Sequence, residues 1–138
     1  MLGMLNPFPE LLVLGLLAPF ILRFSFGLIL LASGWRGLSK ENRGAAVIQL
    51  APSWAVLGTY FVWYITLAEI VAGIMLVLGF LTQIAALIGI ILMLNLFFVR
   101  KQLTAIAPQS ISFYILAVAI CLSLLLSGAG TLAIDLPL

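Results

Sequence analysis

The sequence predicts an all-α membrane protein, built as an antiparallel bundle of four transmembrane helices. Three observations lead there: 65% of the 138 residues are hydrophobic, only 7% are charged, and the mean hydropathy is +1.36. A water-soluble domain usually carries about 25% charged residues, so this chain has too little polar surface to cover a soluble globule. Its apolar runs lack the alternation of apolar and polar residues that a transmembrane β-barrel would need.

The first predicted span covers residues 11–38 and follows the stretch "NPFPE". A spanning helix needs about 20 mainly apolar residues, so this run is long enough to tilt or to extend beyond the hydrocarbon. The polar stretch "SKENRG" follows, and then "AAVIQLAPSWAV", which is too short to span and contains Pro52, a helix breaker. We expect an interfacial turn or short helix there, with Trp54 at the level of the lipid headgroups.

Three further apolar runs complete the predicted bundle, and they cover residues 58–80, 83–99 and 111–126. The turn "GFLTQ" joins the first two of these runs, and the loop "RKQLTAIAPQS", punctuated by proline, precedes the last. All four spans fit a single transmembrane domain over residues 1–138.

Apart from Arg23, the basic residues are confined to two connecting segments, 36–43 and 100–101. These segments follow the first and third spans, so they lie on the same side of the membrane. The positive-inside rule places both in the cytoplasm and both termini outside. The first ten residues carry no Lys or Arg and do not fit a secretory signal peptide, so we expect the N-terminus to be retained.

Two charges of opposite sign, Arg23 and Glu69, lie inside predicted spans. Counted from the presumed cytoplasmic edge, Arg23 is roughly 20 Å deep and Glu69 roughly 16 Å deep. A charge at the centre of a span costs about 2.5–3.5 kcal/mol on insertion scales, and such groups usually face the bundle interior and find partners. We therefore expect the two residues to form a buried polar pair or to share a small polar cavity.

Small and polar residues on the same helical faces, or in a neighbouring span, are the supporting candidates: Gly27, Gly34, Thr66, Gly73 and Asn95. Small residues let helices approach closely in lipid, and Asn95 can form an interhelical hydrogen bond. Three roles of the charges stay open. The pair can serve only to lock the bundle, it can bind a ligand or carry a proton, or Arg23 can reach for the membrane surface or for a partner subunit.

The chain lacks most of the side chains that redox and hydrolytic sites usually need. The chain has no histidine and a single cysteine, Cys121, so it offers no imidazole ligand for haem, no Cys-x-x-Cys pair and no four-cysteine iron–sulfur cluster. Its four acids are scattered. We predict no catalytic residue and no metal site, and we expect the isolated chain to have little means of redox or hydrolytic catalysis. Basic patches interleaved with aromatic residues are also missing, so nucleic acid is not a predicted partner.

Three stretches in order resemble the DoxX family of small bacterial and archaeal membrane proteins: "LRFSFGLILLASGWRGLSK", "LAEIVAGIMLVLGFLTQIAAL" and "GAGTLAIDL". The positions typical of that family fall here on Arg23, Gly27, Gly34, Lys40, Glu69, Gly73, Gly79, Thr82, Gly128, Gly130 and Asp135. The resemblance implies a four-helix fold in a prokaryotic inner or plasma membrane. Family members are described as a subunit of a thiosulfate:quinone oxidoreductase and as partners in membrane oxidoreductase assemblies.

Three functions follow, in this order of preference. The first is a non-catalytic membrane subunit or scaffold linked to a membrane oxidoreductase or to a quinone or thiol redox system. The second is an oxidoreductase subunit that binds a quinone or another lipophile at Arg23 and Glu69. We expect no cofactor other than such a quinone. The third is a small proton-coupled carrier that uses Glu69 and requires oligomerisation. The expected partners are the lipid bilayer, the proteins of an oxidoreductase complex and further copies of this chain.

Overall fold

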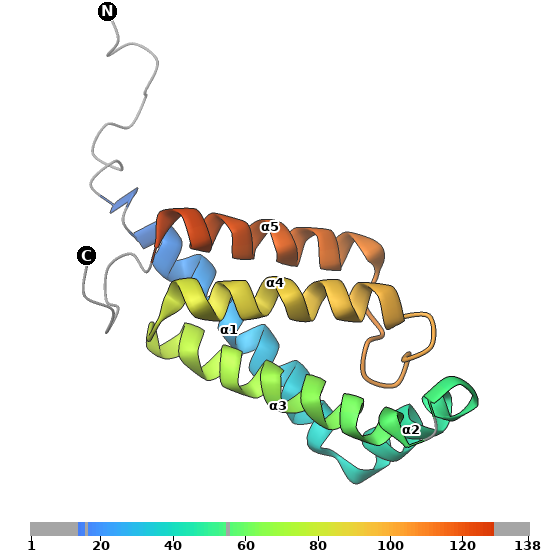
Figure 1. Cartoon of the computed structure of the whole chain (residues 1–138). Coiled ribbons are helices and arrows are strands. Elements are labelled where there is room, and N and C mark those ends of the chain that lie inside the picture. The colour runs from blue at the N-terminus through green and yellow to red at the C-terminus, as the bar shows by residue number, and fades with distance from the viewer. Residues whose placement is uncertain (1–13, 16, 55, 129–138) are drawn as a thin grey trace, which may run out of the picture.

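The structure, a computed structural model, is all-helical over the residues it describes, which are 14, 15, 17–54 and 56–128. It contains five α-helices in that part of the chain (Figure 1): α1 Leu17–Leu38, α2 Lys40–Trp54, α3 Leu57–Leu78, α4 Thr82–Val99 and α5 Ile111–Ser127. The first residues of the predicted first span, both termini and the C-terminal stretch containing Asp135 lie outside the described residues.

Four of these helices correspond to the four predicted spans, with ends that agree within two residues wherever both ends are described. By length and composition, α1, α3 and α4 are each long and apolar enough to cross a membrane. The remaining counterpart, α5, is a shorter apolar helix of 17 residues. The described residues are therefore helical, as predicted, and three of the helices are able to span a membrane by length and composition.

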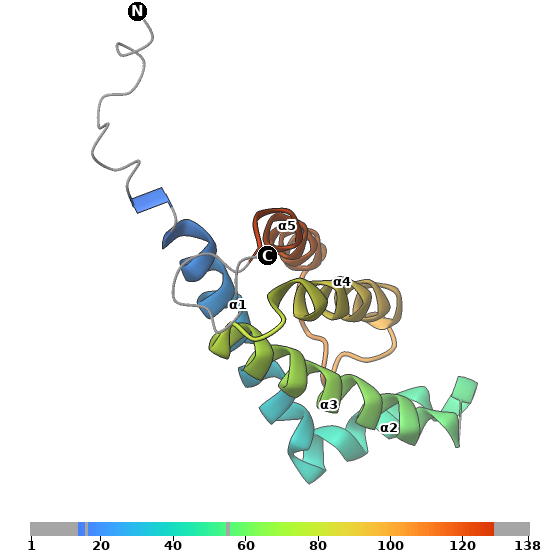
Figure 2. The ribbon, with the colours of Figure 1, turned by 60° about the vertical axis from the view of Figure 1, so that its left-hand side comes forward.

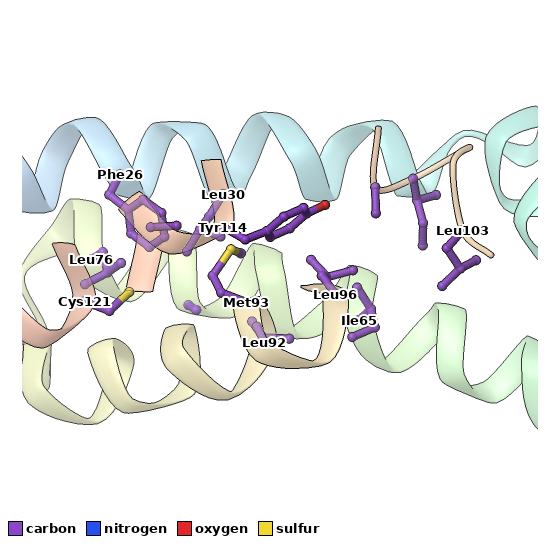
Figure 3. Close-up of a cluster of buried hydrophobic side chains, with 14 of the residues drawn as sticks. Phe26, Leu30, Ile65, Leu76, Leu92, Met93, Leu96, Leu103, Tyr114 and Cys121 are labelled. Atoms are coloured by element: carbon purple, nitrogen blue, oxygen red, sulfur yellow. The ribbon is translucent and has the colours of Figure 1, made fainter. Parts of the chain in front are cut away.

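Helices α1, α3, α4 and α5 surround one core. α1 packs most extensively against α3, α3 contacts α4, α4 contacts α5, and α5 returns to α1. Consecutive members of this set run in opposite directions, and Figure 2 shows them from a second side. Their shared interior is filled by buried side chains (Figure 3), among them Phe26, Leu30, Ile65, Leu76, Leu92, Met93, Tyr114 and Cys121.

The turn between α3 and α4 is tight, as "GFLTQ" predicts. Gly79 ends α3 in the left-handed conformation at φ 68°, which glycine adopts at no steric cost. Its N–H donates to the carbonyl of Leu76 at 3.2 Å, and that of Phe80 donates to the carbonyl of Met75 at 3.0 Å. These bonds satisfy carbonyl groups that the end of a helix leaves open, so α4 can start only four residues after α3 ends.

The polar stretch after α1 is helical, where the sequence suggested a connecting loop. A bend at Ser39 separates α1 from α2, and the side-chain amide of Asn42 donates to the carbonyl of Arg36 at 3.1 Å, which supports the junction. Ala46 and Leu50 of α2 are buried against the bundle, and this packing stabilises a helix that its polar first turns did not indicate. The proline at position 52 lies in the last turn, and the helix ends two residues later.

Helix α2 and the loop 100–110 close the same end of the molecule (Figure 1). The Gln49 side chain joins them, because its Nε2 donates to Thr104 Oγ1 at 3.0 Å and its Oε1 accepts the backbone N–H of Ala105 at 3.2 Å. Leu103 and Ile106 of the loop are buried. The two basic segments, 36–43 and 100–101, therefore lie at one end, as their sequence positions required.

The backbones of α1 and α3 touch at glycines. A Cβ atom added to Gly73 would lie 3.0 Å from the carbonyl oxygen of Gly27 and 2.9 Å from Cγ of Leu31. One added to Gly34 would lie 2.6 Å from Cγ1 of Ile70. Close approach of this kind stabilises helix pairs in lipid, where association depends on van der Waals packing. The expectation that the glycines mark the contact face is thus met by the geometry.

Gly73→Ala should lower the thermal stability of the detergent-solubilised protein, because the added methyl group forces α1 and α3 apart. Overpacking of this kind costs about 1–3 kcal/mol. Gly44→Ala is the matched control, since a Cβ at Gly44 would meet nothing within 4 Å, and alanine favours a helix interior. Melting followed by circular dichroism compares the two. A Gly73→Ala protein as stable as the Gly44→Ala protein would contradict the close approach.

Candidate functional site

The carboxylate of Glu69 lies between α1 and α3, and its residue is 4% exposed. The hydroxyl of Ser33 on α1 donates a hydrogen bond to Oε1 of Glu69 at 2.9 Å. Within the part of the chain that the structure describes, this hydroxyl is the hydrogen-bond partner of the carboxylate. A polar group in a membrane span is costly unless it faces the interior and is paired, and the Ser33 contact meets that requirement in part.

The glycine contacts explain why Ser33 reaches Glu69. They align Gly27 with Gly73 and Gly34 with the turn of α3 that contains Thr66 and Ile70. The two helices run in opposite directions, so a residue beside Gly34 on α1 faces the middle of α3. Ser33 occupies that place.

Thr66 extends the polar strip by one turn of α3 and is 1% exposed. Gly37 of α1 makes room for it, since a Cβ added to Gly37 would lie 2.5 Å from Oγ1 of Thr66. Thr66 and Glu69 therefore both lie against α1. This confirms the sequence-based placement of Thr66 on the same helical face as Glu69.

Tyr114 of α5 adds a third helix to the site. It is buried, its ring meets that of Phe97 edge to face at a centroid distance of 6.5 Å, and its hydroxyl donates to Oε1 of Gln109 at 3.4 Å. Glu69 and Arg100 both lie within electrostatic range of Tyr114. In Figure 3 its ring lies in the core and its hydroxyl points toward the Leu103 end.

Arg23 is also fully buried, but at a different level of the bundle. Its guanidinium carbon lies 5.3 Å from the ring centroid of Phe20, one turn earlier on α1, a distance at which a cation–π interaction contributes. It is ten residues from Ser33, or about 15 Å along the helix axis. The structure therefore brings Ser33, and not Arg23, to Glu69. The sequence-based prediction compared the depths of Arg23 and Glu69 counted from presumed helix ends. It did not take account of the register that the glycine contacts set between α1 and α3.

The remaining supporting candidates have separate places. Gly27, Gly34 and Gly73 form the α1–α3 contact described above. Asn95 of α4 lines a cleft together with Phe61 and Gln102, apart from the Glu69 carboxylate. Sequence reasoning missed Ser33 and Tyr114. Aligning the two glycine-rich faces in opposite directions could have pointed to Ser33, whereas no local signal distinguishes Tyr114 from an interfacial aromatic residue.

The comparison with family models gives one match, to DoxX, over residues 18–102. The chain belongs to the DoxX family. The DoxX match covers nearly all of α1, all of α2 to α4 and the start of the following loop, and it includes Arg23, Ser33 and Glu69. Searches of the curated proteins and of the solved structures gave no match. The family membership that the sequence motifs predicted is confirmed.

A double-mutant cycle separates the two partners considered for Glu69. Ser33→Ala and Glu69→Leu should be coupled by about 0.5–3 kcal/mol, because contacting residues are not additive. Arg23→Leu and Glu69→Leu should be additive, since the two residues occupy different levels. Thermal melting in detergent of the single and double variants measures both couplings. A strong coupling of Arg23 to Glu69 with none for Ser33 would restore the direct pair predicted from the sequence.

Proposed function

We propose that this DoxX-family chain is a non-catalytic membrane subunit or scaffold, associated with a membrane oxidoreductase or with a quinone or thiol redox system. Family membership and the three long apolar helices support its place in the membrane. We include α5 as a fourth span, since its 17 residues extend about 26 Å and meet the lower limit for a spanning helix.

The distribution of side chains carries the membrane part of this proposal. Large apolar residues face outward on every helix of the bundle, as Ile21, Leu67, Leu87 and Ile115 illustrate. Among the residues whose burial the structure describes, the buried polar ones lie inside, and they are Arg23, Thr66, Glu69 and Thr82. Such an arrangement suits lipid as the surrounding solvent, because apolar side chains need no cover there and polar groups do.

The residue inventory supports an assisting role in redox chemistry. The chain has no histidine, and its single cysteine, Cys121, is fully buried, with its sulfur at the position where a Cβ on Gly89 would collide. A buried thiol in apolar surroundings is inert. The electron-transferring groups would then belong to the partner, and this chain would hold that partner at the membrane.

A second candidate function rests on Glu69. The carboxylate and the hydroxyls of Ser33 and Tyr114 come from three helices and lie in the interior. Such a cluster supports binding of a quinone or another lipophile with carbonyl groups, or the transfer of a proton through the carboxyl group in a small carrier. Intramembrane ionisable residues are common in both roles.

We further propose that the basic end faces the cytoplasm. In a Cys121→Ala background, Ser39→Cys marks the basic end and Phe80→Cys marks the turn between α3 and α4 at the other end. A membrane-impermeant maleimide added to intact cells should label position 80 and spare position 39. After the cells are broken open, both positions should react. Labelling of position 39 alone in intact cells would reverse the orientation.

Purification from native membranes in a mild detergent tests the subunit role. We expect an oxidoreductase, identified by mass spectrometry, to copurify in a fixed ratio, and its membrane-bound turnover to fall when the chain is deleted. Glu69→Gln keeps the size of the side chain and separates the two candidates. A scaffold should retain both the partner and turnover with Glu69→Gln. Retained partner with turnover lost, or a quinone bound to the wild-type chain and absent from Glu69→Gln, would favour the second candidate.

A further inference from the structure

A cleft of about 190 Å³ opens between α2, α3, α4 and the loop that follows α4. It lies at the basic end, since its walls include the last turn of α4 and the start of α3. Most of its lining is apolar, contributed by Leu50, Gly58, Phe61, Phe98 and Val99. Phe98 is 77% exposed at its edge, so the cleft is open toward the surface of the bundle that faces lipid in the membrane.

Two amide side chains interrupt the apolar wall, Asn95 and Gln102. Asn95 lies four residues before the end of α4, or about 6 Å inward along the helix. It is half-buried, and the structure gives its side chain no hydrogen bond to any described residue. An amide at that depth is costly in an apolar environment unless it is paired, and the cleft is where an acceptor from a bound molecule can reach it.

Basic residues lie at the same end of the protein as the cleft. Arg100 and Lys101 stand in the chain between the lining residues Val99 and Gln102, and the guanidinium carbon of Arg100 lies 5.3 Å from the ring centroid of Phe97. Arg43 lies at the same end, its guanidinium carbon 4.4 Å from the ring centroid of Trp63 on α3. None of the described residues that line the cleft is acidic. Basic residues at this level of a membrane protein attract anionic lipid headgroups.

We infer that the cleft binds one anionic phospholipid. The order of groups along the wall matches the order of groups in such a lipid. An acyl chain packs on the apolar wall, an ester carbonyl accepts a hydrogen bond from the Asn95 amide, and the phosphate lies at Arg100 and Lys101. A quinone or a neutral lipid would bring no counter-charge to the basic residues that adjoin the cleft in the chain. The inference needs only that the chain lies in a membrane, and it is independent of the redox partner.

Native mass spectrometry of the full chain in detergent tests this site. The protein is titrated with dioleoyl phosphatidylglycerol and, separately, with dioleoyl phosphatidylcholine, which has the same acyl chains and no net charge. We expect one phosphatidylglycerol to bind in preference. Arg100→Gln combined with Lys101→Gln should weaken its binding about tenfold or more. Arg36→Gln combined with Lys40→Gln is the matched control, because it removes the same charge at the same end from residues that have no lining residue beside them in the chain.

The amide is tested in the same way, by comparing Asn95→Leu with Gln83→Leu. Gln83 is the amide at the opposite end of α4, so its loss should leave phosphatidylglycerol binding unchanged, whereas Asn95→Leu should weaken it severalfold. Circular dichroism checks that every variant is folded. Equal weakening by the two charge-removing pairs would reveal diffuse surface attraction and overturn the site. Equal binding of phosphatidylcholine, or no effect of Asn95→Leu, would overturn it as well.

Discussion

The close contact between the backbones of α1 and α3 sets the register of these two helices, and the polar interior follows from it. Gly27 and Gly73 present bare backbone to each other, and Gly34 accommodates Ile70 in the same way. Lipid tails are as apolar as leucine, so two membrane helices gain little by hiding apolar surface from their solvent. They gain by fitting closely, and here the fit fixes which residues of α1 lie opposite which residues of α3.

That register decides the polar interior. It brings the hydroxyl of Ser33 to the carboxylate of Glu69 and leaves room for Thr66 beside Gly37. It also separates Arg23 from Glu69, so these two buried charged residues lie at different heights along the bundle. One lies near the start of α1, and the other lies in the middle of α3. A function that uses Glu69 therefore depends on the contact between α1 and α3, while Arg23 belongs to the opposite half of the molecule.

The connecting segments build the other distinctive part of the protein. Helix α2 and the loop 100–110 are tied together by both ends of the Gln49 amide. Together with α3 and α4 they form the mainly apolar walls of the cleft, at the end of the protein where the basic segments 36–43 and 100–101 lie. An end of this composition suits the boundary between hydrocarbon and headgroups, where apolar and anionic groups of a lipid lie next to each other.

The residues alone were enough to identify a chain of the DoxX family with apolar helices at the predicted places, because motifs, composition and run length are local properties. They also marked Gly27, Gly34 and Gly73 as contact residues. The packing of the helices brings Ser33 to Glu69, places Asn95 at a separate cleft, and makes the polar stretch after α1 a helix. The physical reason is that these helices are apolar on both their core and lipid faces, so their hydrophobic pattern carries no information about which side meets a neighbour. That information lies in the close fit of backbones, which exists only when the helices are packed.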